Sequence, residues 1–493
     1  MTAMRTAAGL LTISAAFAAA AAAQPPPQQP RIARIEATLL PGATIVGRPT
    51  AFMKLAERMA HYHVPAVSIA VIDGHRLAWS RAYGRAEAGG RTATVRTLFQ
   101  AASISKPVFA AAALRLVDQG RLRLDAPIND ALRSWRVPDS DVAPGSALTL
   151  RHLLSHSGGL SVHGFRGYAQ REGVPTLRQL LDGAAPSNSE PIRIVQAPGQ
   201  AWRYSGGGTS IAQQAVEDVT GMPVAQVVRD WLFGTAGMAE SSYEQPLPPA
   251  RALLAATGHL GSGEPVPGRW HVYPERAAAG LWTTPADLAR FALWVMTGLR
   301  SPSAPPEHRF VAAKLIEPQA GHPPGPGERM GLGLFLAGDG PAFRFSHGGA
   351  NEGFRAFLVG FPETGQGAAI MVNGDGGYPL IQEILRAVAL EYGWPERFHE
   401  LLVPARVDAA RLAPLAGTYR WGEEEGSQVH FTVDDGQLTG QRPGDPPVRF
   451  IPMSERSFAD PDRGLRLRFD GDSVVITLPE GPPITAARQA SPQ

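Results

Sequence analysis

Between residues 35 and 400, the apolar positions alternate between the two-residue period of strands and the longer period of helices. Near the start of this region, Ala66–Val71 and Leu77–Trp79 flank Asp73-Gly74, a pair that supplies the positive φ values of a tight turn. These residues predict a β-hairpin.

The end of the same region carries two further strand-like runs, Phe354–Phe361 and Ala368–Val372, before a helical pattern over Leu380–Tyr392. We expect neighbouring strands followed by a closing helix. Strands at both ends with helices between them indicate an α/β or α+β domain whose sheet is assembled from distant segments.

Two helix boundaries can be predicted from the sequence. A helix is expected over Ser103–Gln119, ended by Gly120. A second is expected to begin at Thr284, which can cap it, with Pro285 at the first helical position. Asp287 would return a hydrogen bond to the cap amide.

Residues 403–493 show a different pattern. Apolar and polar residues alternate before Asp435-Gly436 and again before Asp470-Gly471. Two Asp-Gly turns between runs of period two predict antiparallel hairpins, and hence a small C-terminal β domain.

The first 34 residues predict a targeting segment followed by a linker. Residues 1–23 contain an early Arg, an Ala- and Leu-rich apolar stretch and small residues before a cleavage point, as in a signal peptide. Residues 24–34 begin QPPPQQP, which favours an extended Pro-rich linker. We expect export to the periplasm or the medium, with no stable membrane span after cleavage. A retained, uncleaved anchor is the alternative.

The composition excludes several kinds of partner and of chemical site. Of the 493 residues, 46 are Lys or Arg and 44 are Asp or Glu, and no basic run of the kind that nucleic acids require is present. We therefore expect no nucleic-acid partner. The chain has no Cys, which excludes disulfides, thiolate nucleophiles, Cys-ligated zinc and iron–sulfur clusters.

Lysine is rare enough in this chain to be informative. It occurs only at Lys54, Lys106 and Lys314, so 43 of the 46 basic residues are Arg. Arg cannot lose its proton in a protein, whereas a buried Lys can become neutral. Only Lys106 has a Ser three residues earlier, at Ser103.

A Ser and a Lys three residues apart face the same side of a helix, so a neutral Lys106 could take the hydroxyl proton of Ser103. The helix N-terminus would also favour negative charge at Ser103. Alone, this pattern is more often a capping Ser beside a solvated Lys. The flanking residues Phe99–Ala102 and Pro107–Ala112 are nearly uncharged, however, which favours a buried Lys106 with a lowered pKa.

With these residues in place, the chain resembles the superfamily of serine β-lactamases and penicillin-binding proteins. It is most similar to the branch of class C β-lactamases, D-stereospecific peptidases and related esterases. Six segments follow the family's order: LFQAASISK (98–106), LTLRHLLSHSGGL (148–160), WRYSGGG (202–208), AAGLWTTPADL (278–288), GLGLF (331–335) and SHGGANEGF (346–354). The resemblance implies a β-lactamase-like fold, with an antiparallel sheet flanked by helices and an all-helical subdomain.

The resemblance gives a role to Tyr204, in Tyr204-Ser205-Gly206, where the family has a Tyr-x-Asn loop. The Tyr204 hydroxyl would lie near Ser103 and Lys106 and carry protons to the leaving group. The alternative is a loop Tyr that packs its ring and bonds outward. Gly206 replaces an Asn that helps to hold the lysine and the substrate amide, so substrate placement departs from the pattern.

The third family element is a Lys-Thr-Gly strand, matched here by His347-Gly348-Gly349. Gly residues let a substrate approach a strand edge, and by resemblance the amides of Ser103 and Ala350 form the oxyanion hole. A His near its usual pKa is mostly neutral at pH 7, so His347 should attract a substrate carboxylate weakly. This favours esters or peptide-like substrates, unless His347 is only a structural hydrogen-bonder.

Other interpretations are less favoured. His152 and His156 have the spacing of a zinc-protease helix but lack its Glu, and we expect them to be hydrogen-bonding core residues. No strict Gly-x-Ser-x-Gly motif is present, which disfavours a nucleophile-elbow hydrolase. The C-terminal β domain resembles a small lipocalin-like barrel found after some of these catalytic domains. It would cover the cleft, mediate oligomers or act as a passive appendage.

Together these features predict an exported serine hydrolase with a catalytic domain at 35–400, a β domain at 403–493 and an acyl-enzyme on Ser103. Its small-molecule or peptide substrate would be an ester, a D-amino-acid peptide or amide, or a β-lactam, in that order. No metal or organic cofactor is needed, and a homo-oligomer is compatible. The alternative, kept open by Gly206, is a penicillin-binding-type sensor that acylates without efficient turnover.

Overall fold

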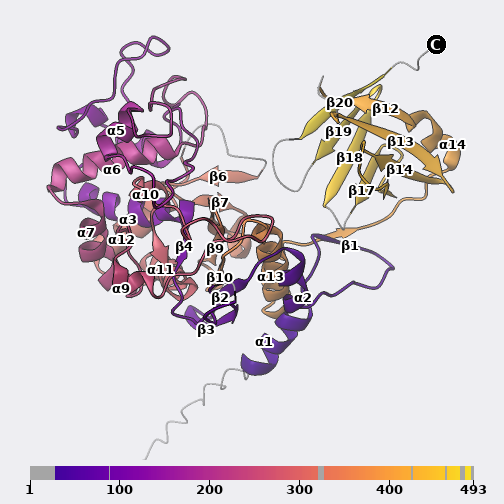
Figure 1. The fold of residues 1–493 in the computed structure, drawn as a ribbon, viewed down its shortest axis with the longest axis horizontal. Helices are drawn as coiled ribbons and strands as arrows, with labels where there is room; N and C mark the ends of the chain where they lie inside the picture. The colour runs from indigo at the N-terminus through magenta and orange to yellow at the C-terminus, as the bar shows by residue number, and fades with distance from the viewer. Residues whose placement is uncertain are drawn as a thin grey trace, which may run out of the picture.

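The computed structural model describes residues 28–87, 89–319, 327–422, 426–460, 464–477 and 483–489. The predicted signal peptide at 1–23 lies outside these ranges. Within them, no helix is both long enough and apolar enough to cross a membrane. Figure 1 shows a large unit of helices and sheet and a smaller β unit drawn in orange to yellow.

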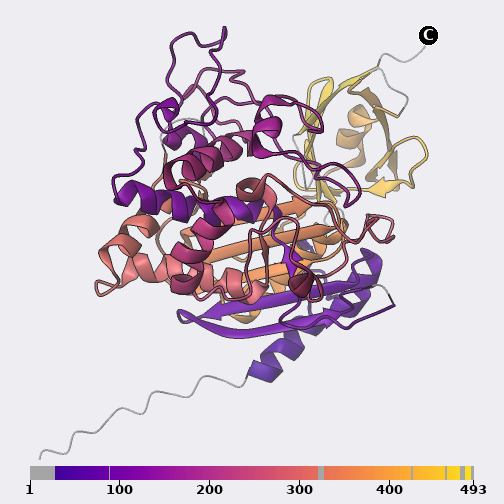
Figure 2. The same ribbon diagram turned by 60° about the vertical axis from the view of Figure 1, so that its left-hand side comes forward.

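The large unit contains a seven-stranded antiparallel sheet with the order β3-β2-β10-β9-β8-β7-β6. Its strands are β2 (Ala66–Asp73), β3 (Arg76–Gly84), β6 (Glu328–Met330), β7 (Phe335–Ala337), β8 (Arg344–Asn351), β9 (Phe354–Phe361) and β10 (Gln366–Val372). The predicted hairpin is confirmed as β2 and β3, with Gly74 at a φ of 56°. Strand β10, from the end of the region, pairs with β2 from its start, which confirms a sheet assembled from distant segments (Figure 2).

Both faces of this sheet are covered by helices. Ile370 of β10 packs into an apolar cluster with α13 (Gly377–Glu391). Its neighbour Met371 belongs to a second cluster with α3 (Ser105–Asp118) and α11 (Pro285–Arg300) on the opposite face. A strand buried on both faces is an unbroken apolar run, which is why β10 was visible in the sequence. The predicted closing helix is confirmed as α13.

Two N-terminal helices, α1 (Gln28–Ala37) and α2 (Leu55–His61), join the cluster of α13. The extended linker predicted at 24–34 is wrong for residues 28–34, which belong to helix α1. Pro30 falls in its first turn, where a missing N–H costs no hydrogen bond. Ile32 and Ile35 are buried against the sheet cluster, so packing overrides the Pro-rich composition.

The regular elements between β3 and β6 are almost all helices, joined by long loops. They are α3, α4 (Leu150–Leu154), α5 (Leu177–Asp182), α6 (Gly206–Thr220), α7 (Val224–Val228), α8 (Gly234–Ala236), α9 (Pro249–Ala252), α10 (Arg276–Ala279), α11 and α12 (Pro306–Leu315), with two short paired strands, β4 (Phe99–Gln100) and β5 (Trp282–Thr283).

The predicted start of α11 is correct in part. Thr284 accepts a hydrogen bond from the amide of Asp287, as a cap should. The carboxylate of Asp287 does not return the bond. It accepts instead from the amide of Glu240 and the hydroxyl of Ser241, at 2.8 and 2.9 Å, because the loop that precedes α9 lies against the helix start.

The C-terminal unit is an antiparallel sheet of nine strands that nearly closes into a barrel. Its order is β15-β14-β13-β12-β20-β19-β18-β17-β16, and Phe450 alone separates β15 from β16 in the chain. The strands are β12 (Gly417–Arg420), β13 (Gln428–Asp434), β14 (Gln437–Gln441), β15 (Val448–Arg449), β16 (Ile451–Pro452), β17 (Ser457–Asp460), β18 (Leu465–Asp470), β19 (Ser473–Thr477) and β20 (Ile484–Arg488), and helix α14 (Ala409–Leu412) precedes them. The two predicted Asp-Gly hairpins are confirmed as β13–β14 and β18–β19.

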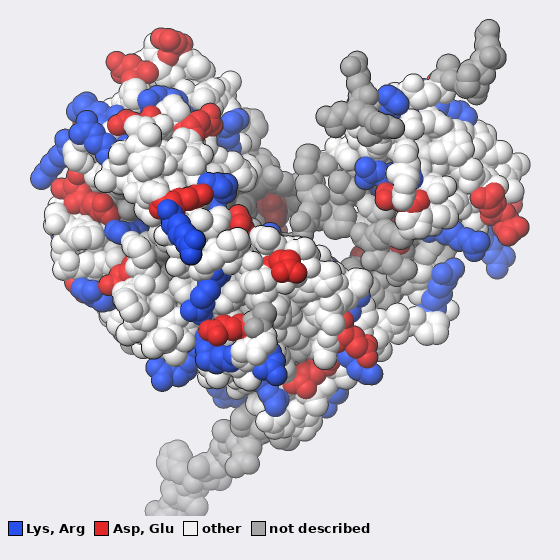
Figure 3. Space-filling view, viewed as in Figure 1, with Lys and Arg blue, Asp and Glu red and all other residues white. Residues whose placement is uncertain are grey.

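A parallel pair of short strands joins the two units. Strand β1 (Ala43–Ile45) pairs with β11 (Glu400–Leu402), and Ala43 and Leu402 pack against Ala459 of the barrel. On the face seen in Figure 3, basic side chains are interspersed with acidic ones, as the nearly equal charge counts lead one to expect.

Candidate active site

Ser103 lies in a 3-10 turn, Ala102–Ile104, directly before α3. The helix predicted to begin at Ser103 therefore begins two residues later. Ala102 has a φ of 49°, a left-handed conformation that is uncommon for Ala. Strained backbone of this kind clusters at functional sites, where surrounding structure holds it in place.

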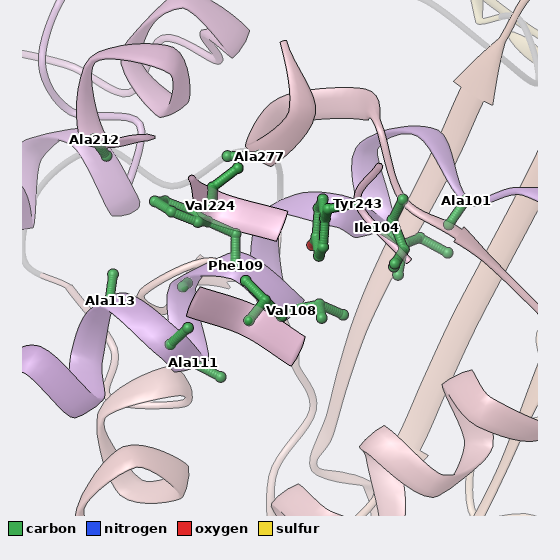
Figure 4. Close-up of a cluster of buried hydrophobic side chains, with 14 of the residues drawn as sticks. Ala101, Ile104, Val108, Phe109, Ala111, Ala113, Ala212, Val224, Tyr243 and Ala277 are labelled. Atoms are coloured by element: carbon green, nitrogen blue, oxygen red, sulfur yellow. The ribbon is translucent and has the colours of Figure 1, made fainter. Parts of the chain in front are cut away.

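Lys106 is almost fully buried, with 4% of its surface exposed. Its Nζ lies 2.9 Å from the Oγ of Ser103 and 2.9 Å from the main-chain oxygen of Ala278. The chain around it is apolar, and Ile104, Val108 and Phe109 belong to the cluster of buried apolar side chains drawn in Figure 4. Burial disfavours the ammonium and lowers the pKa of Lys106 to about 7.

Tyr204 lies against the same pair. Its ring centroid is 4.9 Å from the Nζ of Lys106. Burial raises the pKa of the Tyr204 phenol above its usual value, and a hydrogen bond with Ser103 acts in the opposite direction. Ser103 and Lys106 are thus brought together with Tyr204, which lies about a hundred positions later in the chain.

The loop of Tyr204 is fixed by the start of α6. The hydroxyl of Ser205 accepts from the amide of Gly208 at 3.0 Å, as an N-cap, and donates to the oxygen of Ser161 at 2.7 Å. Gly206 is buried, and a Cβ there would lie 2.9 Å from the Phe165 ring. A larger residue, such as the Asn of the family pattern, would require the Phe165 ring to shift.

Strand β8 approaches the Ser103 turn closely. A Cβ on Gly349 would lie 2.2 Å from the main-chain oxygen of Ala101, so only Gly fits at this point. Among the described residues, β7 pairs only with Arg344–Ser346 of β8. The backbone of β8 from His347 to Ala350 is thus left without a strand partner on that side, beside Ser103.

His347 is 2% exposed and neutral. Its Nδ1 lies 2.6 Å from the oxygen of Gly348, so Nδ1 carries the proton and Nε2 is left as an acceptor with no hydrogen-bond partner among the described residues. Burial, assisted by the charge of Lys106, lowers the pKa of His347 to about 3. The sequence predicted a mostly neutral ring, and burial makes this neutrality complete at pH 7.

These residues open onto a cleft of about 710 Å³. It is lined by Ser103, His163, Gly164, Phe165, Trp202, Tyr204, Phe335, His347, Gly348, Gly349, Ala350, Arg355 and Tyr378. Of the residues predicted to bind the substrate, only Gly206 is not among those that line this cleft. The lining is largely aromatic, and the guanidinium of Arg355 is paired with Asp375 at 2.8 Å.

Sequence reasoning missed most of the aromatic lining. Trp202 and Phe335 lie in two of the segments that resemble the family, WRYSGGG and GLGLF, and were given no role. Phe165 and Tyr378 lie outside those segments, and nothing in the sequence singles them out. Among the described residues, no group of three or more His, Asp or Glu side chains could hold a metal ion.

The sequence pattern of the family described as Beta-lactamase matches residues 53–392 of this chain. The chain belongs to the beta-lactamase family. The resemblance and the fold class predicted from the sequence are therefore confirmed.

Several curated proteins are similar to this beta-lactamase family member. It is 28% identical over 384 residues to "Penicillin-binding protein 4" of Amycolatopsis lactamdurans, which covers 74% of this chain and 94% of that protein. It is 33% identical over 238 residues to "Esterase EstB" of Burkholderia gladioli, covering 46% and 58% of the two chains. It is 23% identical over 318 residues to the "D-alanyl-D-alanine-carboxypeptidase/endopeptidase AmpH" of Escherichia coli strain K12, covering 62% and 79%.

Solved structures extend the likeness of fold to the C-terminal unit. The octameric penicillin-binding protein homologue from Pyrococcus abyssi has a TM-score of 0.58 at 20% identity, over 87% of this chain and 98% of that chain. The D-alanine carboxypeptidase AmpC of Burkholderia cenocepacia has a TM-score of 0.54 at 20% identity, over 69% and 96%. Membership of this family makes the chain an enzyme of the serine hydrolase type.

Proposed function

We propose that the chain hydrolyses neutral esters through an acyl-enzyme on Ser103. The observation that carries this proposal is the 2.9 Å contact between the Oγ of Ser103 and a buried Lys106 whose pKa is about 7. At neutral pH about half of the Lys106 side chains are free amines, so the Ser103 hydroxyl has a base within reach. The oxygen of Ser103 attacks the carbonyl carbon while its proton passes to Lys106.

The remaining steps use groups around the same cleft. Tyr204, hydrogen-bonded to Ser103, delivers a proton to the departing alcohol and is reprotonated by Lys106, which had received the Ser103 proton. Water then attacks the acyl carbonyl and gives a proton to Lys106, while the Ser103 oxygen leaves and takes a proton back. The amides of Ser103 and Ala350 hold the carbonyl oxygen as it gains charge. The close approach of Gly349 to the Ser103 turn supports this pairing.

The choice of an ester rests on charge. D-Alanyl peptides and β-lactams carry a carboxylate, and a site for them needs a cation. His347 is neutral, with a pKa of about 3, and the guanidinium of Arg355 is already paired with Asp375. The aromatic rings along the cleft favour an apolar acyl or alcohol group. The similarity to an esterase of Burkholderia gladioli supports the same class.

The test compares three substrates on the purified protein: 4-nitrophenyl butyrate, a D-alanyl-D-alanine peptide and a chromogenic cephalosporin. We expect turnover of the ester to exceed that of the other two, and Ser103→Ala to abolish it. Lys54→Ala is the matched control, because Lys54 is exposed and paired with Glu57. Preferred hydrolysis of the peptide or the cephalosporin would contradict the ester assignment.

A fluorophosphonate and a fluorescent penicillin test the alternative of a sensor. The observation that favours a sensor is Gly206, which supplies no amide side chain at the position where the family has an Asn. A stable adduct on Ser103 without turnover of any substrate would support the sensor in place of the hydrolase.

We also propose that the protein is exported and that residues 1–23 are removed. The early Arg, the apolar stretch and the small residues before Gln24 support this. N-terminal sequencing of the protein recovered outside the cytoplasm should begin near Gln24. A chain that begins at Met1 would contradict cleavage.

A further inference from the structure

His156 accepts hydrogen bonds from the residues immediately before and after Tyr204 in the chain. Its main-chain oxygen accepts a hydrogen bond from the amide of Arg203 at 2.7 Å. Its Nδ1 accepts another from the amide of Ser205 at 3.3 Å. The two residues that flank Tyr204 in the chain are therefore anchored to the same His.

The ring of His156 also lies against Tyr204 itself. The two ring centroids are 4.2 Å apart with an interplanar angle of 34°. The Nζ of Lys106 is 4.9 Å from the same Tyr204 centroid. A change in the tilt of the Tyr204 ring would therefore move its hydroxyl relative to Ser103 and Lys106.

The chemistry of His156 suits a fixed support better than a proton carrier. Because Nδ1 accepts a hydrogen bond, the neutral ring carries its proton on Nε2. Burial lowers the pKa of His156 well below its usual value, and the positive charge of Lys106 acts in the same direction. The ring is thus neutral across the pH range in which Lys106 titrates.

Shape alone does not explain a histidine at this position. Nε2 of His156 is buried and has no hydrogen-bond partner among the described residues, which costs free energy that an apolar ring would avoid. The backbone is in the left-handed region, with a φ of 58°, which His adopts more readily than most residues other than Gly, but this does not account for the buried Nε2. The group that an apolar ring would lack is the Nδ1 acceptor, and that acceptor binds the Tyr204 loop.

We propose that His156 is a positioning residue that holds the Tyr204 hydroxyl between Ser103 and the leaving group. This inference rests on the proposed function, in which Tyr204 gives its proton to the departing alcohol. His156 is not among the described residues that line the cleft, so it acts through Tyr204 and not on the substrate.

Esters with different leaving groups distinguish the positioning of Tyr204 from general structural support, because only some leaving groups need a proton from Tyr204. 4-Nitrophenolate departs as a stable anion, whereas ethoxide must be protonated as it leaves. Misplacement of Tyr204 should therefore slow hydrolysis of ethyl butyrate far more than hydrolysis of 4-nitrophenyl butyrate.

Three variants of His156 test the idea. His156→Gly removes the ring and suits a φ of 58°. His156→Phe keeps a ring but removes the acceptor, and it serves if the Gly variant does not fold. His156→Asn restores an acceptor for the Ser205 amide and tolerates the same φ. His152→Ala is the matched control, because His152 lies one helical turn earlier and no described hydrogen bond joins it to the Tyr204 loop.

The measured quantity is kcat/KM for each ester. We expect His156→Gly and His156→Phe to lose about 100-fold on ethyl butyrate and less than about 10-fold on 4-nitrophenyl butyrate, with most of the loss recovered in His156→Asn. His152→Ala should leave the ratio of the two esters unchanged. Equal losses on both esters, or no loss on either, would overturn the positioning role alone. Wild-type protein that hydrolyses neither ester, or that retains activity as Ser103→Ala, would overturn the proposed function and this role with it.

Discussion

Lys106 and Glu275 are ionisable residues that the chain buries almost completely, and burial shifts both toward the neutral form. It lowers the pKa of Lys106 to about 7 and raises the pKa of Glu275 to about 8. Lys106 gains a free amine beside Ser103. Neither carboxyl oxygen of Glu275 forms a hydrogen bond with another described residue, so no described contact compensates for burying this group. Glu275 occupies the N-cap position of α10 without a side-chain capping bond, and the Ala278 oxygen of the same helix accepts a hydrogen bond from Lys106.

Glu275→Gln should therefore stabilise the protein at neutral pH. In the folded chain Glu275 keeps its proton up to about pH 8, whereas in the unfolded chain it loses it near pH 4.5. The folded state thus binds more protons between these values, and wild-type stability falls as pH rises through that window. We expect Gln to raise the free energy of unfolding at pH 7.5 by about 2 kcal/mol. The two proteins should differ little at pH 4, by urea unfolding. A difference that is the same at both pH values would contradict a buried neutral Glu275.

At the residue scale, the sequence predicted those site residues that have a local signature. Ser103 and Lys106 are one turn apart in a nearly uncharged segment, and Lys is rare elsewhere, so chemistry and spacing are visible without a structure. The aromatic lining could not be predicted. Phe165, Phe335 and Tyr378 come from three distant segments, and only the fold brings them to one cleft.

At the scale of elements, the contact between β8 and the Ser103 turn determines the geometry of the site. Gly349 lies so close to Ala101 that any side chain would force the strand away from the turn. The amide of Ala350 follows on the same strand, and its distance from Ser103 depends on that contact.

Gly349→Ala tests this contact against the neighbouring Gly348→Ala. A Cβ on Gly349 would lie 2.2 Å from the Ala101 oxygen, whereas one on Gly348 would have its nearest neighbour at 3.8 Å. We expect Gly349→Ala to lower the free energy of unfolding by about 2 kcal/mol, and Gly348→Ala to change it by less than about 0.5 kcal/mol. Acylation of Ser103 should slow by about 100-fold in Gly349→Ala, because one oxyanion donor is displaced. Equal stability of the two variants would show that β8 does not need this approach.

Elements with an uninterrupted pattern were predicted well, and those that depend on tertiary contacts were not. The hairpin of β2 and β3 and helix α13 follow from periodicity and turn residues alone. The helix at Ser103 begins late because Ala102 is held in a left-handed conformation beside β8. Helix α1 was missed because its Pro-rich start gave no hint that Ile32 and Ile35 would be buried.

At the scale of the whole molecule, the two units have separate apolar cores. The barrel core contains Tyr419, Phe431 and Phe469, and it shares no residue with the two clusters around the seven-stranded sheet. The β1–β11 pair and the small cluster of Ala43 form the junction. Among the described residues, those that line the cleft all lie before residue 400. The barrel therefore supplies no described residue to the lining of the cleft. Covering the cleft is one of the three roles that the sequence suggests for this domain.

Separate cores predict two thermal transitions in a calorimetric scan. Phosphonylation of Ser103 should raise the midpoint of the larger transition by several degrees and leave the other unchanged, because the noncovalent contacts of the phosphonyl group with the cleft exist only in the folded state. Phosphonate-treated Ser103→Ala is the control. A single cooperative transition that moves as a whole would contradict independent units.

The most direct test of the catalytic account is the rate at which a fluorophosphonate labels Ser103 as a function of pH. Below pH 7 Lys106 is a cation and cannot accept a proton, so the wild-type rate should rise through an inflection near pH 7 to a plateau above it. Lys106→Ala should label about 1000-fold more slowly and lose that inflection, while Lys54→Ala should follow the wild type. Labelling of Lys106→Ala at the wild-type rate, or an adduct on a residue other than Ser103, would contradict the account.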